Sequence, residues 1–188
     1  MDGIPAVGET AVIHGKTVLA IIPARGGSKR LARKNILLLA GKPLVVWSIE
    51  AGLKSRYVDR VVVTSEDDEI QNKSLEGGAE IVTRPRELAT DEASSFLAIE
   101  HVINEIDDKY DFTVLLQPTS PLRNSDHINE AFDLLVEKNA DAVISVCETD
   151  HSPLWANTLP RDKSMKGFLR DNIKGVRSQD LPKYYRLN

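Results

Sequence analysis

A loop rich in positive charge is the part of the sequence whose residue types point most clearly to chemistry. Residues 24–35 contain five lysines and arginines and no acidic residue, although the whole chain of 188 residues has a formal charge of −4. Two adjacent glycines let backbone N–H groups approach a ligand closely, and the surrounding cations supply fixed positive charge. This combination predicts a polyphosphate-binding loop, and a solvated basic loop is the alternative. The residues concerned are Ala24, Arg25, Gly26, Gly27, Ser28 and Lys29, followed by Lys34 and Asn35.

Two further stretches carry polar side chains that could recognise a ligand. Residues 84–95 combine arginines with serine hydroxyls before a predicted helix, a set that can read the edge of a nucleobase. Ordinary helix capping and surface charge are the alternative. Residues 115–123 contain two prolines, which restrict the backbone. We expect this stretch to present polar side chains at the edge of the sheet, and a rigid strand-to-helix turn is the alternative. The side chains are Gln117, Thr119, Ser120 and Arg123.

Two familiar nucleotide-binding motifs are excluded. Gly15-Lys16-Thr17 looks like the end of a Walker A motif, but the first glycine of that motif would fall at Thr10. The triplet also precedes the first predicted strand instead of following it. Gly26-Gly27 does not fit the GxGxxG dinucleotide fingerprint. The sequence therefore does not predict a P-loop ATPase or a Rossmann dehydrogenase.

The elements that must position these loops are short apolar runs alternating with segments of helical spacing. Nearly unbroken apolar runs are typical of parallel strands that are covered on both faces. They predict an α/β fold with a doubly wound, mainly parallel sheet, whose ligands bind beyond the carboxyl ends of the strands. The runs lie at 17–22, 60–64, 79–83, 112–116 and 142–146, and the helical segments at 43–53, 66–76, 96–106 and 125–136.

Length and composition predict one main domain. Hydrophobic residues make up 41% and charged residues 28%, as in ordinary globular proteins. We divide the chain into an N-terminal extension (1–16), an α/β domain (17–150) and a C-terminal segment (151–188), which is either a loose tail or an arm packed on another subunit. A single cysteine and the lack of an apolar run of about 20 residues favour a cytoplasmic protein with no membrane span. Mild acidity argues against a general nucleic-acid binder.

Taken together, these segments resemble the CMP-sialic acid synthetases, the cytidylyltransferases that activate nine-carbon acidic sugars. The resemblance runs from about Val18 to the last residue, and its motifs occur in order at the expected strand ends. It implies a sheet of the nucleotide-diphospho-sugar transferase type with a small dimerisation arm, and hence a homodimer. The matching motifs are IIPARGGSK (21–29) with Lys34-Asn35, Arg84-Pro85 with Ser94-Ser95, LQPTSPLR (116–123) and YRLN (185–188).

The resemblance also implies a reaction and a set of roles. CMP would pass from CTP to the anomeric hydroxyl of a 2-keto sugar acid, N-acetylneuraminic acid or a relative such as legionaminic or pseudaminic acid, with release of pyrophosphate. Arg25 and Lys34 would be catalytic, holding the triphosphate together with the rest of the loop (Ala24, Gly26, Gly27, Ser28 and Lys29). For the nucleoside, Asn35 would face the ribose or base, Arg84 would donate to cytosine O2, and Ser95 and the backbone near Ala93 would read N3 and the amine. For the sugar, Gln117 would make contact and Arg177 would pair with the carboxylate.

One feature of the family has no counterpart before the last residue. Members continue through an Asp-x-Asp pair that binds magnesium, so Mg²⁺ is expected as a cofactor with ligands beyond Asn188 and none within this chain. Asp91, Asp126 and Asp150 are interpreted as residues that cap or flank elements. Two other functions stay open: a cytidylyltransferase for the eight-carbon sugar Kdo, and a catalytically silent nucleotide-binding module. The run Gln117–Pro121 favours the nine-carbon branch.

Overall fold

The chain divides into two compact units in the computed structural model, which describes residues 13, 15–29 and 31–187. The first unit ends at Val143 and the second covers Ile144–Asn188. The sequence places this boundary after residue 150. The expected N-terminal extension (1–16) lies almost wholly outside the described residues.

The first unit is built on a four-stranded parallel sheet. Its strand order is β5-β4-β1-β6, with β1 (Val18–Pro23) and β4 (Arg60–Ser65) in the centre and β5 (Glu80–Thr83) and β6 (Phe112–Leu115) at the edges. These strands confirm four of the five predicted apolar runs. The two central strands are buried along almost their whole length, as expected for strands covered on both faces.

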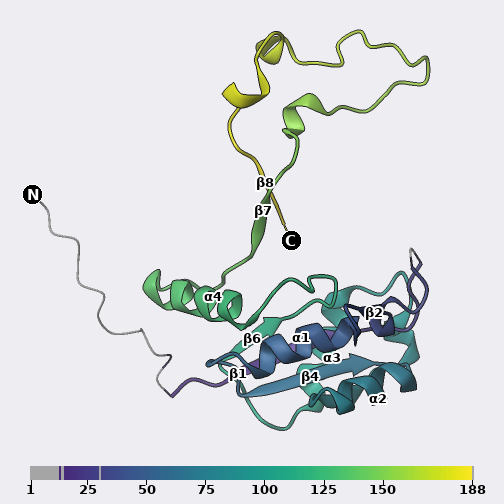
Figure 1. The fold of residues 1–188 in the computed structure, drawn as a ribbon, viewed down its shortest axis with the longest axis vertical. Helices are drawn as coiled ribbons and strands as arrows, with labels where there is room; N and C mark the ends of the chain where they lie inside the picture. Colours follow the sequence, from purple (N-terminus) through teal and green to yellow (C-terminus); the bar gives the residue numbers. More distant parts are fainter. Residues whose placement is uncertain (1–12, 14, 30, 188) are drawn as a thin grey trace, which may run out of the picture. The chain divides into compact units, whose positions relative to one another are not determined.

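Four helices cover both faces of this sheet. On one face, α1 (Leu44–Leu53), α2 (Asp68–Glu76) and α4 (Ser125–Glu137) pack against the β1 side chains of Val18, Ala20 and Ile22. On the other face, α3 (Ser95–Glu105) packs against Leu19 and Ile21. Figure 1 shows the helices on the two sides of the sheet. The fold is therefore α/β and doubly wound, as predicted.

The prediction of a fifth buried strand at 142–146 is wrong for this structure. Residues 142–145 form no strand, and Ile144 is 69% exposed. Strand β7 (Val146–Glu148) instead pairs antiparallel with β8 (Tyr185–Leu187) in a separate two-stranded sheet of the second unit. An apolar run becomes a buried strand only where a neighbouring strand pairs with it, and among the described residues none pairs with the outer edge of β6.

The remaining elements are short. In the first unit a two-stranded hairpin of β2 (Leu38–Leu39) and β3 (Lys42–Pro43) leads into α1, and two 3-10 helices, η1 (Lys34–Ile36) and η2 (Arg86–Ala89), lie in loops. The second unit contains three further 3-10 helices, which are η3 (Pro153–Trp155), η4 (Asp171–Ile173) and η5 (Ser178–Asp180).

Parallel pairing brings the carboxyl ends of all four strands to one edge of the sheet. β1 ends at Pro23, β4 at Ser65, β5 at Thr83 and β6 at Leu115. The segments that follow them are therefore neighbours at this edge, whatever their separation in sequence. Three of these segments are the stretches that the sequence singled out for chemistry.

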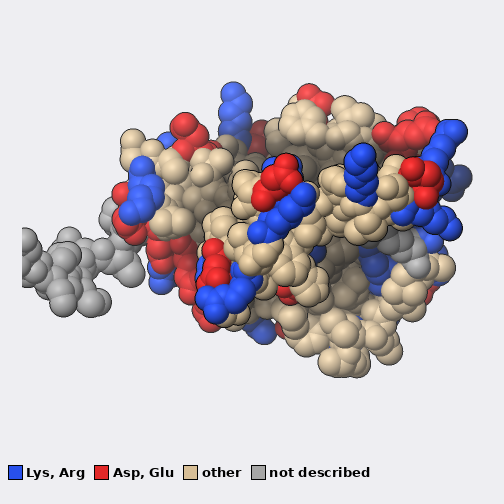
Figure 2. Space-filling model, turned by 90° about the horizontal axis from the view of Figure 1, so that it is seen from above, with Lys and Arg blue, Asp and Glu red and all other residues tan. Residues whose placement is uncertain are grey.

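Charged side chains of both signs are interspersed on the face shown in Figure 2, where Lys and Arg lie beside Asp and Glu. Ion pairs join many charges of opposite sign among the described residues; Arg60, for example, contacts both Glu80 and Asp108. No helix of the described chain has both the length and the apolar character needed to cross a bilayer.

An acidic residue ties the amino ends of β1 and β6 together. Asp111 accepts hydrogen bonds from Lys16 Nζ at 2.6 Å and from the Thr17 N–H at 2.9 Å. The pKa of Asp111 is lowered, chiefly by the hydrogen bond from Lys16 and then by the bond from the Thr17 backbone. The folded state therefore favours the charged carboxylate.

The lowered pKa predicts a pH-dependent stability. A depressed folded-state pKa stabilises the fold above the unfolded value of about 4, and this contribution disappears as the pH falls through the folded value. We expect Asp111→Asn to unfold at lower urea concentration than the wild type at pH 7 and at nearly the same concentration near pH 3. Urea titrations followed by circular dichroism test this; an equal gap at both pH values would contradict it.

Candidate active site

A cavity of about 650 Å³ lies at the carboxyl edge of the sheet. Its lining comes from the loop after β1, the segment between β5 and α3, the start of α3 and the turn after β6. The structure thus brings together the three stretches that the sequence singled out. The predicted site residues in the lining are Arg25, Ser28, Lys29, Lys34, Asn35, Arg84, Ala93, Ser95 and Gln117.

The other predicted site residues lie elsewhere. Ala24 is fully buried and donates its N–H to Thr64 O at 3.0 Å. Gly27 lines a smaller neighbouring cavity of about 290 Å³. The Gly26 N–H donates to Glu66 Oε1 at 2.8 Å and is thus committed within the protein. Arg177 belongs to the second unit, where it pairs with Asp180 at 2.8 Å.

Two of the cavity cations converge on one carboxylate. Arg25 Nη2 lies 2.8 Å from Asp91 Oδ1, and Lys29 Nζ lies 2.9 Å from Asp91 Oδ2. Arg25 Nη1 also donates to Thr90 O at 3.0 Å. The pKa of Asp91 is lowered, first by the hydrogen bond from Lys29 and then by that from Arg25. Asp91 therefore supplies a negative charge where the cations would meet an anionic ligand.

The structure corrects the interpretation of Asp91 as a helix cap, although the residue does flank α3. The cap of α3 is Ser94, whose side chain accepts a hydrogen bond from the Phe96 N–H. Asp91 lies in the segment before that cap and faces the loop after β1 instead. Sequence spacing alone could not distinguish these roles, because both residue types are common caps.

Removing the charge of Asp91 should strengthen the binding of a polyphosphate. In Asp91→Asn, Arg25 and Lys29 no longer meet a competing anion, although solvent-exposed ion pairs of this kind are only weakly stabilising. We expect the Kd of inorganic tripolyphosphate to fall by roughly two- to tenfold by isothermal titration calorimetry. Asp108→Asn, at the opposite end of the sheet, is the matched control and should leave the Kd unchanged. Weaker binding in Asp91→Asn would show that Asp91 positions the cations.

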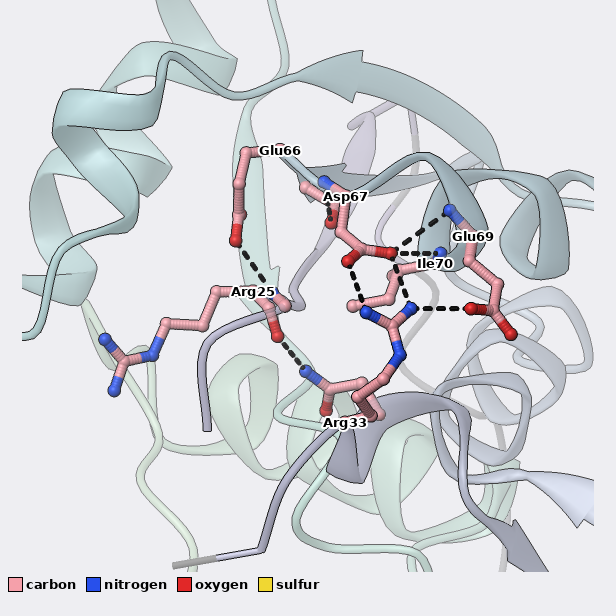
Figure 3. Close-up of polar contacts among 9 residues, drawn as sticks. Arg25, Arg33, Glu66, Asp67, Glu69 and Ile70 are labelled. Carbon is pink, nitrogen blue, oxygen red and sulfur yellow. Dashed lines mark hydrogen bonds and ion pairs between the residues drawn. The ribbon is translucent and has the colours of Figure 1, made fainter. Parts of the chain in front are cut away.

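Lys34 and Asn35 reach the cavity from η1. Asn35 is 5% exposed, and its Nδ2 donates to Arg25 O at 2.8 Å. The amide thus fixes the backbone of the loop (Figure 3). Lys34 is half-buried beside it in the lining. Contact of either side chain with a nucleotide remains a prediction.

Arg84 enters the cavity from β5 as a buried cation. It is 5% exposed, and its Nη2 donates to Thr64 O at 2.9 Å. The pKa of Arg84 is lowered by desolvation, an effect that the nearby charge of Glu66 opposes. An arginine keeps its charge at neutral pH despite such a shift, because its usual pKa lies far above neutral pH. The Ala93 N–H, on the same side, donates to Thr90 Oγ1 at 3.2 Å.

The turn after β6 differs in part from its prediction. Gln117 is exposed and lines the cavity, as does Thr119, whose hydroxyl donates to Gln117 Oε1 at 3.3 Å. Arg123 instead donates to Ser48 Oγ on α1 at 2.8 Å and to Gln117 O at 3.2 Å. The prediction that Arg123 is presented at the edge of the sheet is therefore wrong, because its side chain points inward and stabilises the turn.

With this geometry established, comparison with known proteins identifies the family. A family model described as cytidylyltransferase matches residues 19–174.

The chain belongs to the cytidylyltransferase family.

Individual relatives within this family are similar to the chain over most of its length. The chain is 40% identical to an N-acylneuraminate cytidylyltransferase of Streptococcus agalactiae serotype III over 173 residues, which are 89% of this chain and 41% of that protein. It is 36% identical to a pseudaminic acid cytidylyltransferase of Campylobacter jejuni over 171 residues, or 89% and 73% of the two chains. These relatives confirm the resemblance to CMP-sialic acid synthetases. The chain spans about two fifths of the length of the streptococcal relative.

A solved structure supports the fold. The synthetase of CMP-2-keto-3-deoxy-manno-octonic acid, determined as a complex with CTP, superposes with a TM-score of 0.65. The match covers 92% of this chain and 71% of that one at 19% sequence identity. At this identity the likeness concerns the cytidylyltransferase fold alone.

The described residues contain no evident metal centre. Among them there is no group of three or more His, Cys, Asp or Glu side chains that could hold an ion. Asp91 is paired with cations, and Asp126 lies in the first turn of α4. The side chains present therefore do not form a magnesium site by themselves.

The sequence does not predict the acids around the basic loop. Its spacing indicates a cap or flanking residue at Asp91, and no motif in it points to a site role for Glu66 or Asp67. Glu66 and Asp67 directly follow β4, which pairs with β1, so the rule that sites lie beyond the carboxyl ends of strands places them near the site. This position alone does not suggest a role for acidic residues, because an anion site is expected to be lined by cations.

Proposed function

We propose that this cytidylyltransferase transfers CMP from CTP to the anomeric hydroxyl of a nine-carbon 2-keto sugar acid, N-acetylneuraminic acid or a relative, and releases pyrophosphate. The observation that carries the proposal is the cavity at the carboxyl edge of the sheet, where Arg25, Lys29 and Lys34 line one space. Its volume lies in the usual range for small-molecule sites. The names of the relatives, which act on N-acylneuraminate or pseudaminic acid, favour nine-carbon acids over Kdo.

The chemistry is a displacement at the α-phosphorus of CTP. The anomeric oxygen forms a bond to this phosphorus, the bond to the bridging oxygen of the β-phosphate breaks, and pyrophosphate leaves with the electron pair. The hydroxyl proton passes to solvent. Protein groups accelerate such a reaction by positioning the reactants and by neutralising charge that develops on the leaving group.

In this proposal Arg25 and Lys34 hold the triphosphate and stabilise the leaving pyrophosphate, with Ser28 and Lys29 beside them. Arg84, Ser95 and the backbone near Ala93 recognise cytosine, and Asn35 faces the nucleoside. Gln117 touches the sugar acid and Arg177 pairs with its carboxylate. Shared membership of one cavity supports the nucleotide-binding roles. The role of Arg177 rests on the family resemblance alone.

The proposal includes Mg²⁺ as a companion of the triphosphate, but no step is assigned to it, since the described residues form no metal cluster. It also includes a homodimer, a cytoplasmic setting and the absence of a nucleic-acid partner. The supporting features are exposed apolar side chains in the second unit, such as Trp155 and Leu159, a single free cysteine and a net charge of −4.

A pyrophosphate-release assay tests the proposed function. The chain is incubated with CTP, Mg²⁺ and a panel of sugar acids that includes N-acetylneuraminic, legionaminic and pseudaminic acids and Kdo. We expect turnover with at least one nine-carbon acid. Turnover with Kdo alone would assign the rival activity, and CTP binding without turnover on any acid would identify a silent nucleotide-binding module.

A further inference from the structure

Two neighbouring acidic residues contact the basic loop. Glu66 and Asp67 follow β4, whose neighbour β1 leads into the loop. Glu66 Oε1 accepts the Gly26 N–H at 2.8 Å, as Figure 3 shows. The other carboxylate oxygen, Oε2, is buried and has no hydrogen-bond partner among the described residues. Glu66 therefore uses one oxygen to fix the backbone at the start of the loop.

Asp67 holds the far end of the loop. Its two oxygens accept hydrogen bonds from Arg33 Nη1 at 2.9 Å and Nη2 at 3.1 Å. Glu69 adds a third contact to the same guanidinium at 2.7 Å. Asp67 also caps α2, since it accepts from the N–H groups of Glu69 and Ile70. The pKa of Asp67 is lowered, chiefly by Arg33. A rigid helix end thus anchors the loop (Figure 3).

The anchored arginine has an unusual backbone. Arg33 has φ 55° and ψ 26°, a left-handed conformation that costs a residue other than glycine free energy. It directly precedes η1, which carries Lys34 and Asn35 into the cavity. The ion pairs with Asp67 and Glu69 hold the Arg33 side chain at the point where η1 begins.

Asp67 also lies very close to Gly26, the first residue of the glycine pair. A Cβ atom on Gly26 would lie 2.7 Å from Asp67 Oδ2, closer than real Cβ contacts, and 3.0 Å from Asp67 Cβ, tighter than most of them. A Cβ on Gly27 would meet nothing within 4 Å. A side chain at Gly26 would therefore have to displace Asp67, which is a reason for glycine at this position separate from ligand access.

We propose that Glu66 and Asp67 are positioning residues, which clamp the two ends of the basic loop so that the cations lining the cavity are held in place for the phosphates of the nucleotide. Glu66 engages the Gly26 N–H and Asp67 engages Arg33, while Arg25, Lys29 and Lys34 line the cavity. Cations fixed in advance stabilise a phosphate charge without reorganising when the ligand arrives. The identity of the ligand rests on the proposed function.

Calorimetric titration with CTP and with CMP tests the clamp. Both ligands share the nucleoside, so a defect in the loop should affect the ligand with the additional phosphates. We expect Glu66→Ala to raise the Kd of CTP by about tenfold or more, the factor that a hydrogen bond to a charged group represents, and to change that of CMP by less than about threefold. Glu66→Gln, whose amide oxygen can still accept the Gly26 N–H, should stay within about threefold of the wild type for both ligands.

Controls separate positioning from general stability. Glu76→Gln removes an exposed acid of α2, which pairs with Lys73, and should change neither affinity. Arg33→Gln releases the other end of the loop and should reproduce the selective loss for CTP if Glu66→Ala does not fold. Equal losses for CTP and CMP, or no loss in either loop variant, would overturn the proposal.

A measurement without ligand distinguishes this proposal from the proposed function. Hydrogen exchange of peptides that cover residues 24–33 should become faster in Glu66→Ala than in the wild type, while peptides from β1 and β4 stay protected. Unchanged exchange in the loop would overturn the clamp even if CTP binds. Faster exchange together with a wild type that binds no CTP would uphold the clamp and reject the proposed function.

Discussion

Replacing Arg25 by alanine should lower the rate of CMP transfer by roughly 10²–10³, the usual effect of removing one preorganised donor from a developing negative charge. Arg25 enters the cavity from the buried end of β1, and its backbone is held by Asn35. The side chain donates hydrogen bonds to Thr90 O and, at longer distance, Ala89 O, and it pairs with Asp91, all in the segment before α3. We therefore expect loss of activity with an intact fold, measured as pyrophosphate release beside a circular dichroism spectrum.

Arg86→Ala is the matched control for this variant. Arg86 lies in η2, two residues beyond Arg84, and is exposed. Its removal takes away the same charge from the same side of the sheet, so a rate within about threefold of the wild type is expected. Near-normal activity in Arg25→Ala, or an equal loss in Arg86→Ala, would contradict the assignment of Arg25 to the triphosphate.

The second large effect concerns stability. Ile21→Ala should lower the free energy of unfolding by about 2–5 kcal/mol, as large-to-small substitutions in cores do. Ile21 is fully buried in β1 and packs with Val62 and Val102, which join the sheet to α3. The cavity left behind cannot be filled readily, because the sheet fixes the backbone on either side. Urea unfolding followed at 222 nm measures this change, since the α-helices of the described chain all belong to the first unit.

Ile103→Ala provides the comparison on α3. Ile103 is 48% exposed, and exposed substitutions away from special features usually change stability by no more than about 0.5 kcal/mol. Ile99, Ile103 and Ile106 recur at helical spacing in the sequence, which predicts that Ile103 is buried with the other two, whereas the structure exposes it. A loss in Ile103→Ala as large as in Ile21→Ala would show that α3 buries a different face from the one described.

The central sheet could be predicted from the sequence because its signal is local. Unbroken apolar runs such as those of β1 and β4 are typical of strands covered on both faces. Predictions that depend on a pairing partner were less successful. The run at 142–146 is similarly apolar, but its strand pairing depends on chain elements distant in sequence. Likewise, the helical stripe of α3 could not reveal that Phe96 is 66% exposed while Ala98 is buried.

The composition of the candidate site was predictable in part. Three separate stretches meet in one cavity because parallel strands bring their carboxyl ends to one edge, a rule that needs only the strand assignments. The acids that organise the site were not predictable, because the pairing of Arg25 with Asp91 and of Arg33 with Asp67 depends on side-chain geometry. The hydrogen bond from Arg123 to Ser48 was not predictable for the same reason, because it also depends on side-chain geometry.

A crystal structure of the protein with CTP tests the central claim most directly. We expect the triphosphate at the carboxyl end of β1, with its oxygens within hydrogen-bonding distance of Arg25 and Lys34 and with Asp91 displaced from at least one of its two cations. A nucleotide bound away from this loop, or a loop still fully paired with Asp91 beside a bound triphosphate, would contradict the account.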